Sequence, residues 1–180
     1  MSGDSAIKRL TRTGTGLSDV GRKRTSNEDA YFFDDRLGLY IVGDGMGGHA
    51  AGEIASQEAV ETVYGMVKRG ISTLHELAHP PVEEDVRAAC RLMESSIQAA
   101  TYMVYSMAEL DRQKSGMGTT LSSLLVLGEY AVTAIQDAFG HRVDQVERRH
   151  VDDALPALLD QSAAVVSVPD EAPHQRRAVA

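Results

Sequence analysis

The sequence predicts an α+β fold, because short strand-like segments and long amphipathic helices occur in separate blocks along the chain. Short apolar segments bounded by turn residues come first, two helical patterns follow, and two further strand patterns surround a turn. With 180 residues, 43% of them apolar and 24% charged, the chain is long enough to bury the core of one globular domain.

The first part of the chain predicts a flexible lead-in and then a sheet built from hairpins. We expect the polar lead-in over residues 1–13 and strands over residues 16–21, 30–34 and 37–43. Asp34 and Asp35 stand between the last two strands, where a turn is required. Three short strands before any helix disagree with a βαβ unit.

Two amphipathic helices are predicted next. The first is expected from about residue 50 to residue 68 and to end at Gly70. The second begins at an acidic run after two prolines, and its apolar positions alternate spacings of three and four. These positions are Val86, Cys90, Met93, Ile97, Ala100, Val104 and Met107. Cys90, the only cysteine of the sequence, is therefore expected to pack in the core.

The last third of the chain changes character after residue 138. Residues 115–135 predict two strands around the turn Gly128-Glu129. The segment 139–180 is charged and divergent, and it predicts one more helix over residues 140–161 followed by a disordered tail. We therefore expect the main domain to span residues 14–138.

The charge of the chain limits its partners. A formal net charge of −8 and a pI near 5.2 argue against nucleic acid, which requires clustered Lys and Arg. No segment approaches the ~18 apolar residues of a membrane span, and the first residues lack the apolar region of a secretion signal. We expect a cytoplasmic protein without a membrane partner. The oligomeric state stays open.

A glycine pattern after the third predicted strand suggests a dinucleotide-binding loop. Gly43, Gly45 and Gly48 satisfy G-x-G-x-x-G between a strand-like and a helix-like segment. That motif requires a parallel strand after the helix, whereas a broken segment and a second helix follow. Asp44 also places a carboxylate where the loop would meet a pyrophosphate. Both observations disfavour a nicotinamide or flavin enzyme.

A second pattern is the H-E-x-x-H motif of zinc peptidases, formed by His75, Glu76 and His79. Such a site needs both histidines on one face of a long helix. Here two prolines directly after His79 end the helix, so an exposed linker is favoured and a zinc peptidase stays a distant alternative.

A third pattern gathers oxygen ligands. Glu28 and Asp29 precede one predicted strand, and Asp44 and Gly45 end the next. Mg²⁺ and Mn²⁺ prefer carboxylate and carbonyl oxygens and keep several waters, so these residues suit a hard divalent cation. This interpretation also accounts for Asp44, which the dinucleotide interpretation could not place.

Three segments that contain these residues resemble successive motifs of the metal-dependent protein phosphatases, the PPM or type 2C family. They are "SDVGRKRTSNEDAYF", "YIVGDGMGGHAAGEIAS" and "SGMGTTLSSLLVL", in the family's order and with two helical patterns between the second and the third. The resemblance covers about residues 16–138. It implies part of an α-β-β-α sandwich of largely antiparallel sheets, with a pair of long antiparallel helices on one face.

The resemblance also implies a site and a reaction. By this likeness Asp44 bridges two Mn²⁺ or Mg²⁺ ions, the Gly45 carbonyl binds one of them, and Glu28 and Asp29 hold metal-bound waters. Arg24 grips the phosphate of the substrate. A metal-activated water then hydrolyses phosphoserine or phosphothreonine in a protein that a serine/threonine kinase has phosphorylated.

The sequence departs from the family in two places. Met46 stands where some relatives have a histidine, which leaves His49 as a weak candidate for the proton donor. Near the end of the resemblance "IQDAF" keeps Asp137, but two later motifs that supply metal-binding aspartates are missing. The chain is thus either a phosphatase with a truncated or altered end or a non-catalytic phosphatase-like binding module. A frameshift and natural divergence both remain open as the origin of that end.

Overall fold

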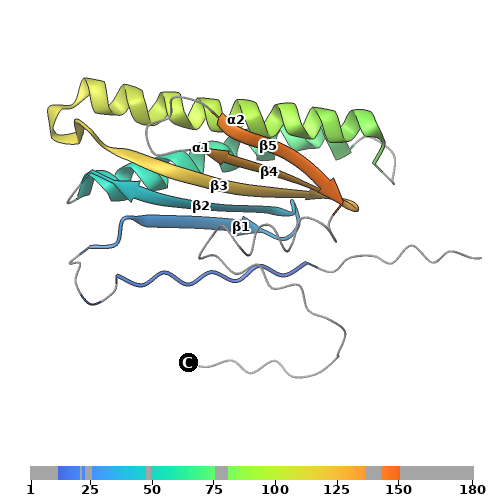
Figure 1. Cartoon of the computed structure of the whole chain (residues 1–180), viewed down its shortest axis with the longest axis horizontal. Coiled ribbons are helices and arrows are strands. Elements are labelled where there is room, and N and C mark those ends of the chain that lie inside the picture. Colours follow the sequence, from blue (N-terminus) through green and yellow to red (C-terminus); the bar gives the residue numbers. More distant parts are fainter. Residues whose placement is uncertain are drawn as a thin grey trace, which may run out of the picture.

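The computed structural model describes residues 12–20, 22, 26–47, 50–75, 81–136 and 143–150 (Figure 1). The strands are β1 (Asp29–Asp34), β2 (Leu39–Met46), β3 (Gly118–Leu127), β4 (Tyr130–Gln136) and β5 (Val143–His150). Two long helices, α1 (Ala50–His75) and α2 (Glu83–Leu110), and the short 3-10 helix η1 (Arg112–Lys114) lie between β2 and β3 in the chain. The predicted α+β class is confirmed.

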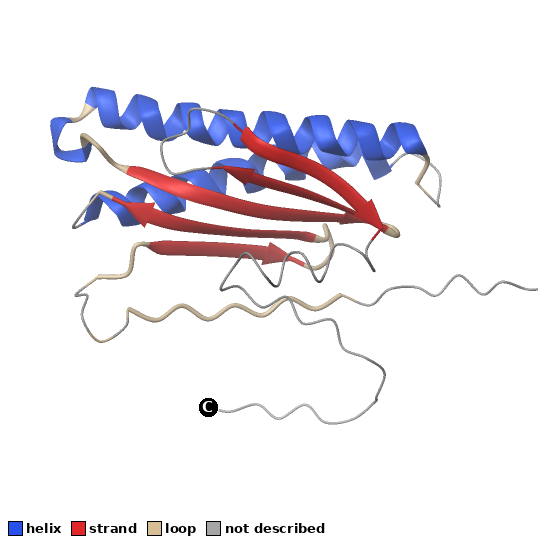
Figure 2. Ribbon diagram, in the orientation of Figure 1, coloured by secondary structure: helices blue, strands red, loops and turns tan. Residues whose placement is uncertain are grey.

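The five strands form one antiparallel sheet in the order β1-β2-β3-β4-β5. Both long helices cover the same face of this sheet and run antiparallel to each other (Figures 1 and 2). The described residues therefore contain one sheet and one helical layer of the sandwich that the family resemblance implies. None of the described helices combines the length and the apolar character needed to cross a bilayer.

The core lies between the sheet and the two helices. Alternate residues of β2 point to the helices, so Leu39 and Ile41 are buried while Tyr40 and Val42 face the other side. The helices contribute Ala55, Ala59, Val63, Val67, Met93, Ile97 and Ala100, all fully buried. The apolar stripe predicted for the second helix is thus confirmed, with Cys90 half-buried against this core.

An extended segment, residues 12–20, lies across the face of the sheet that the helices leave open. The Arg12 guanidinium donates to the Val126 carbonyl over 2.8 Å, and the Gly14 amide donates to Asp35 Oδ1 over 2.7 Å. The strand predicted over residues 16–21 is wrong for residues 16–20, which join no β-ladder. Side-chain anchors and the aromatic rings under Gly14 and Gly16 hold this segment instead of ladder hydrogen bonds.

Helix α1 continues through Gly70, where the sequence predicted its end, and runs to His75. The reason is packing between the helices. A Cβ atom at Gly70 would lie 2.5 Å from Leu92 Cδ1, so the bare backbone of α1 makes room for this side chain of α2. Tertiary contact therefore outweighs the modest cost of glycine inside a helix.

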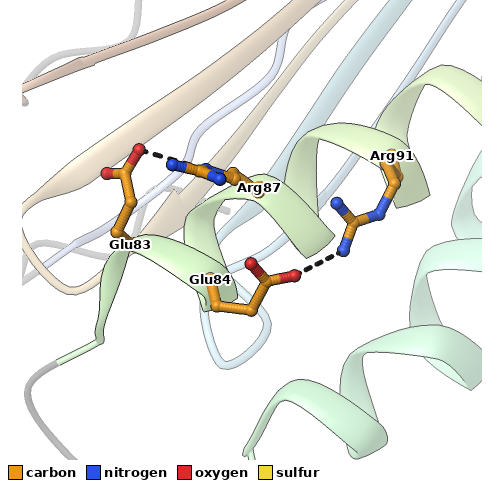
Figure 3. Close-up of polar contacts among 4 residues, drawn as sticks. All are labelled: Glu83, Glu84, Arg87 and Arg91. Atoms are coloured by element: carbon orange, nitrogen blue, oxygen red, sulfur yellow. Dashed lines mark hydrogen bonds and ion pairs between the residues drawn. The ribbon is translucent and has the colours of Figure 1, made fainter.

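The first turn of α2 is acidic, as the sequence predicted. Asp85 Oδ2 accepts a hydrogen bond of 2.9 Å from the Val82 amide and so satisfies a backbone donor at the helix start. Glu83 pairs with Arg87 over 3.3 Å and Glu84 with Arg91 over 3.0 Å (Figure 3). These exposed pairs contribute little stability.

Residues 143–150 form strand β5, paired with β4, so the helix predicted over residues 140–161 is wrong there. The local sequence is charged and fits a helix, but β4 would otherwise present an unpaired edge of N–H and C=O groups. Pairing along that edge decides the conformation. The remainder of the divergent segment, including the predicted tail, lies outside the described residues.

Candidate metal centre

One end of the sheet brings together four segments that are far apart in the sequence. The start of β1, the end of β2, the start of β3 and the start of α1 meet at the left of Figure 1. In the strand register Asp29 lies opposite Asp44, and Asp44 lies opposite Thr120. Three polar residues therefore form a row across three strands.

Asp29 and Asp44 face the same side of the sheet. Residues directly opposite each other in an antiparallel pair project to one face, and both of these side chains are exposed. Two carboxylates in this arrangement repel each other unless a cation lies nearby. The Asp44 amide contacts Thr120 Oγ1 at 3.4 Å, so the threonine hydroxyl also belongs to this surface. The register thus builds an acidic, oxygen-rich position at the sheet end.

Gly45 brings the end of β2 close to α1. A Cβ atom at Gly45 would lie 2.1 Å from the Gly52 carbonyl oxygen and 2.5 Å from the Glu28 carbonyl oxygen. Only glycine fits between two backbones this close. The Gly45 amide donates to the Glu28 carbonyl over 3.0 Å, which ties the residue before β1 to the end of β2.

The Glu28 side chain extends toward the first turn of α1. Its Oε1 atom lies 2.7 Å from the position that a Cβ at Gly52 would take. The bare backbone at Gly52 therefore leaves the space that the carboxylate occupies. Glu28 is adjacent to Asp29 in the chain, but its carboxylate approaches the helix while Asp29 faces the open side of the sheet.

This donor set fits a hard divalent cation. The groups present are carboxylate, carbonyl and hydroxyl oxygens, which Mg²⁺ and Mn²⁺ prefer. Within the described ranges, however, no three His, Cys, Asp or Glu side chains gather closely enough to hold a metal by themselves. A cation held by Asp29 and Asp44 would keep water at several coordination positions.

Several predicted site residues lie outside the described residues. They are Arg24, His49, Asp137, Glu76 and His79. His75 is the last residue of α1, and its side chain is not among those described. Of the predicted set, the structure places Glu28, Asp29, Asp44 and Gly45 at this end of the sheet, with Asp29 and Asp44 on one face and the Glu28 carboxylate directed to α1.

The topology excludes the dinucleotide-binding interpretation of the glycine loop. A Rossmann unit needs a parallel strand directly after the helix. Here α1 is followed by α2, and the next strand, β3, pairs antiparallel with β2. Gly43 and Gly45 instead serve close packing between β2 and α1.

Sequence reasoning missed two residues at this end of the molecule. Thr120 lies in a predicted strand and received no role in the site, although its register position opposite Asp44 places it beside the carboxylates. Ser56, fully buried in α1, donates from its hydroxyl to the Glu28 carbonyl over 2.6 Å. A polar residue on the apolar face of the predicted first helix was the available signal for Ser56.

Known proteins resemble the chain in sequence and in fold. No family model matches the chain. The chain is 29% identical over 148 residues to the serine/threonine protein phosphatase PstP of Mycobacterium tuberculosis, covering 80% of the chain and 26% of PstP. It is 32% identical over 122 residues to the protein phosphatase PhpP of Streptococcus pneumoniae, covering 66% of the chain and 44% of PhpP.

A solved structure of the PstP catalytic domain in complex with two manganese ions superposes with a TM-score of 0.50. The sequence identity is 26%, and the match covers 66% of this chain and 45% of that one. The match thus spans less than half the length of each of these three relatives. Over the part that it shares with these relatives, the chain is similar in sequence and in fold to the serine/threonine protein phosphatases.

Proposed function

We propose that the chain carries part of a metal-dependent protein serine/threonine phosphatase site, centred on Asp44. The observation that carries this proposal is the register pair of Asp29 and Asp44, two exposed carboxylates on one face at the sheet end. Such a pair needs positive charge nearby, and the PstP catalytic domain was solved with two manganese ions.

In the proposed site Asp44 and the Gly45 carbonyl would hold the metal ions, and Glu28 and Asp29 would orient water. When bound, two Mn²⁺ or Mg²⁺ ions activate a water and neutralise the charge that develops on the phosphoryl group. Arg24 binds the phosphate of the substrate with its forked donors. The reaction is hydrolysis of a phosphomonoester without a covalent enzyme intermediate.

The proposed substrate is a protein phosphorylated on serine or threonine by a serine/threonine kinase, and the proposed location is the cytoplasm. The relatives PstP and PhpP are named as protein phosphatases, which supports this substrate class. The chain's net charge of −8 supports a protein substrate over a nucleic acid.

The test is to titrate metal-free protein with Mn²⁺ and to measure the heat of binding by calorimetry. Asp44→Asn should remove most of the binding heat, because it removes a shared carboxylate ligand while keeping the shape of the side chain. Glu94→Gln is the matched control, since it removes one exposed charge from α2. Equal Mn²⁺ binding by parent, Asp44→Asn and Glu94→Gln would refute the proposed metal centre.

A second candidate is a phosphatase-like module that binds a phosphoprotein without turning it over. The observation that favours it is that the described residues gather no three potential metal-ligating side chains. Retained affinity for a phosphothreonine peptide, together with no phosphate release at saturating Mn²⁺, would support this candidate over the enzyme.

A further inference from the structure

The Glu28 carbonyl oxygen is held by two donors from different elements. The Gly45 amide of β2 donates to it over 3.0 Å, and the Ser56 hydroxyl of α1 donates over 2.6 Å. Ser56 has no exposed surface, so water does not compete for this hydroxyl. Its oxygen also lies 3.1 Å from the Glu53 carbonyl of its own helix, but the contact with Glu28 is the shorter one.

These two bonds hold the backbone from which the Glu28 side chain extends. Glu28 precedes β1 and is outside the strand ladder, so the ladder does not fix its backbone. The carbonyl is instead tied to β2 and α1, and the side chain passes over the bare backbone of Gly52. The helix therefore sets the position of a carboxylate that belongs to the strand segment.

We infer that Ser56 is a positioning residue for the Glu28 carboxylate in the metal centre. This inference rests on the proposed function, because it assigns a role to Glu28 at bound metal. Ser56 itself touches no substrate or metal in this arrangement. It acts by fixing the backbone of Glu28, as hydrogen bonds behind metal-site residues commonly do.

The molecule contains a matched control residue. Ser96 in α2 is also fully buried, and its hydroxyl donates only to Met93 of its own helix, over 2.8 Å. Ser56 and Ser96 thus share burial and the local helix contact. They differ in that Ser56 also bonds a residue 28 positions earlier in the chain.

The experiment compares Mn²⁺ affinity, by calorimetry, for the parent, Ser56→Ala, Ser96→Ala and Ser56→Thr. We expect Ser56→Ala to weaken Mn²⁺ binding about tenfold, the lower end of the loss typical for such supporting residues. Ser96→Ala should bind as the parent does. Ser56→Thr keeps a hydroxyl that can reach the same carbonyl, and it should recover most of the lost affinity.

The outcomes separate this inference from the proposed function. A parent chain that binds no Mn²⁺ refutes the proposed function itself. A parent chain that binds Mn²⁺, with equal affinities for Ser56→Ala and Ser96→Ala, overturns the inference alone. A Ser56→Thr variant that binds Mn²⁺ as weakly as Ser56→Ala also overturns the inference. The inference is overturned as well if Ser56→Ala no longer folds while Ser96→Ala does, because Ser56 would then be structural.

Discussion

Replacing Gly45 with alanine should separate the end of β2 from the start of α1. The added Cβ would lie 2.1 Å from the Gly52 carbonyl oxygen and 2.5 Å from the Glu28 carbonyl oxygen, both backbone atoms. Real contacts of this kind do not fall below 3.0 Å, so the helix must retreat by about 1 Å. Overpacking of this kind costs roughly 1–3 kcal/mol, and loss of the Gly45–Glu28 hydrogen bond adds about 1 kcal/mol. We expect a loss of about 3 kcal/mol in the free energy of unfolding.

Gly43→Ala is the matched control, because Gly43 lies on the same strand and faces the same helix. Its Cβ would meet Thr119 Oγ1 at 3.2 Å and Val60 Cγ2 at 3.4 Å, which are side-chain atoms able to shift. We expect a change within about 1 kcal/mol, since alanine also restricts the unfolded chain. The assay is urea unfolding followed by far-ultraviolet circular dichroism, because the chain has no tryptophan. Equal losses of stability for the two variants would refute the close approach of β2 and α1.

Three further predictions follow from other parts of the molecule. Burial and then the hydrogen bond to Asp35 raise the pKa of Tyr40 to about 12, so its neutral hydroxyl stabilises the fold below pH 10 and this contribution is lost as the pH rises toward 12. A shift of two pKa units corresponds to at most roughly 2.7 kcal/mol of unfolding free energy, and the partial exposure of Tyr40 reduces this contribution to about 1 kcal/mol. The Tyr40→Phe variant should lack this pH-dependent contribution in unfolding curves measured at alkaline pH. Gly52→Ala should stabilise the metal-free protein against thermal unfolding by up to about 1 kcal/mol, yet weaken Mn²⁺ binding by displacing the Glu28 carboxylate; unchanged affinity would contradict that placement. The chain should hydrolyse p-nitrophenyl phosphate at least about 10²-fold more slowly than a family member with all its metal-ligand motifs, because a weakly held metal stabilises little transition-state charge. Comparable turnover, lost on Asp44→Asn, would mean that another aspartate such as Asp137 replaces the missing ligands.

The sequence predicted the elements whose signals are local. The spacing of apolar residues identified α2, and Gly128 with Glu129 marked the turn between β3 and β4. Gly128 adopts φ +59 in that turn, a conformation that favours glycine. The meeting of Asp29 and Asp44 was also predictable, because the two residues flank a single hairpin.

The errors occurred where distant segments decide the local structure. Gly70 resembles a helix terminator until Leu92 of the neighbouring helix fills the space beside it. The charged residues 143–150 become a strand only because β4 offers an unpaired edge. Ser56 stands out as a polar residue on the apolar face of α1, but the sequence does not identify Glu28 as its partner, since that contact depends on how α1 lies against β1.

Asp29 and Asp44 lie opposite each other across β1 and β2, and this position couples strand pairing to ion binding. Among the described strands β1 lies at the edge and pairs with β2 alone, and its first residue carries one of the two repelling charges. A cation bound between them would favour the paired strand, and the paired strand would in turn favour the cation by the same free energy. The stabilisation grows as RT ln(1 + [L]/Kd), so β1 would be most firmly docked when metal is abundant. If Mn²⁺ slows amide hydrogen exchange more in β1 than in β4, the exchange rate of the β1 backbone amides would therefore report the binding equilibrium.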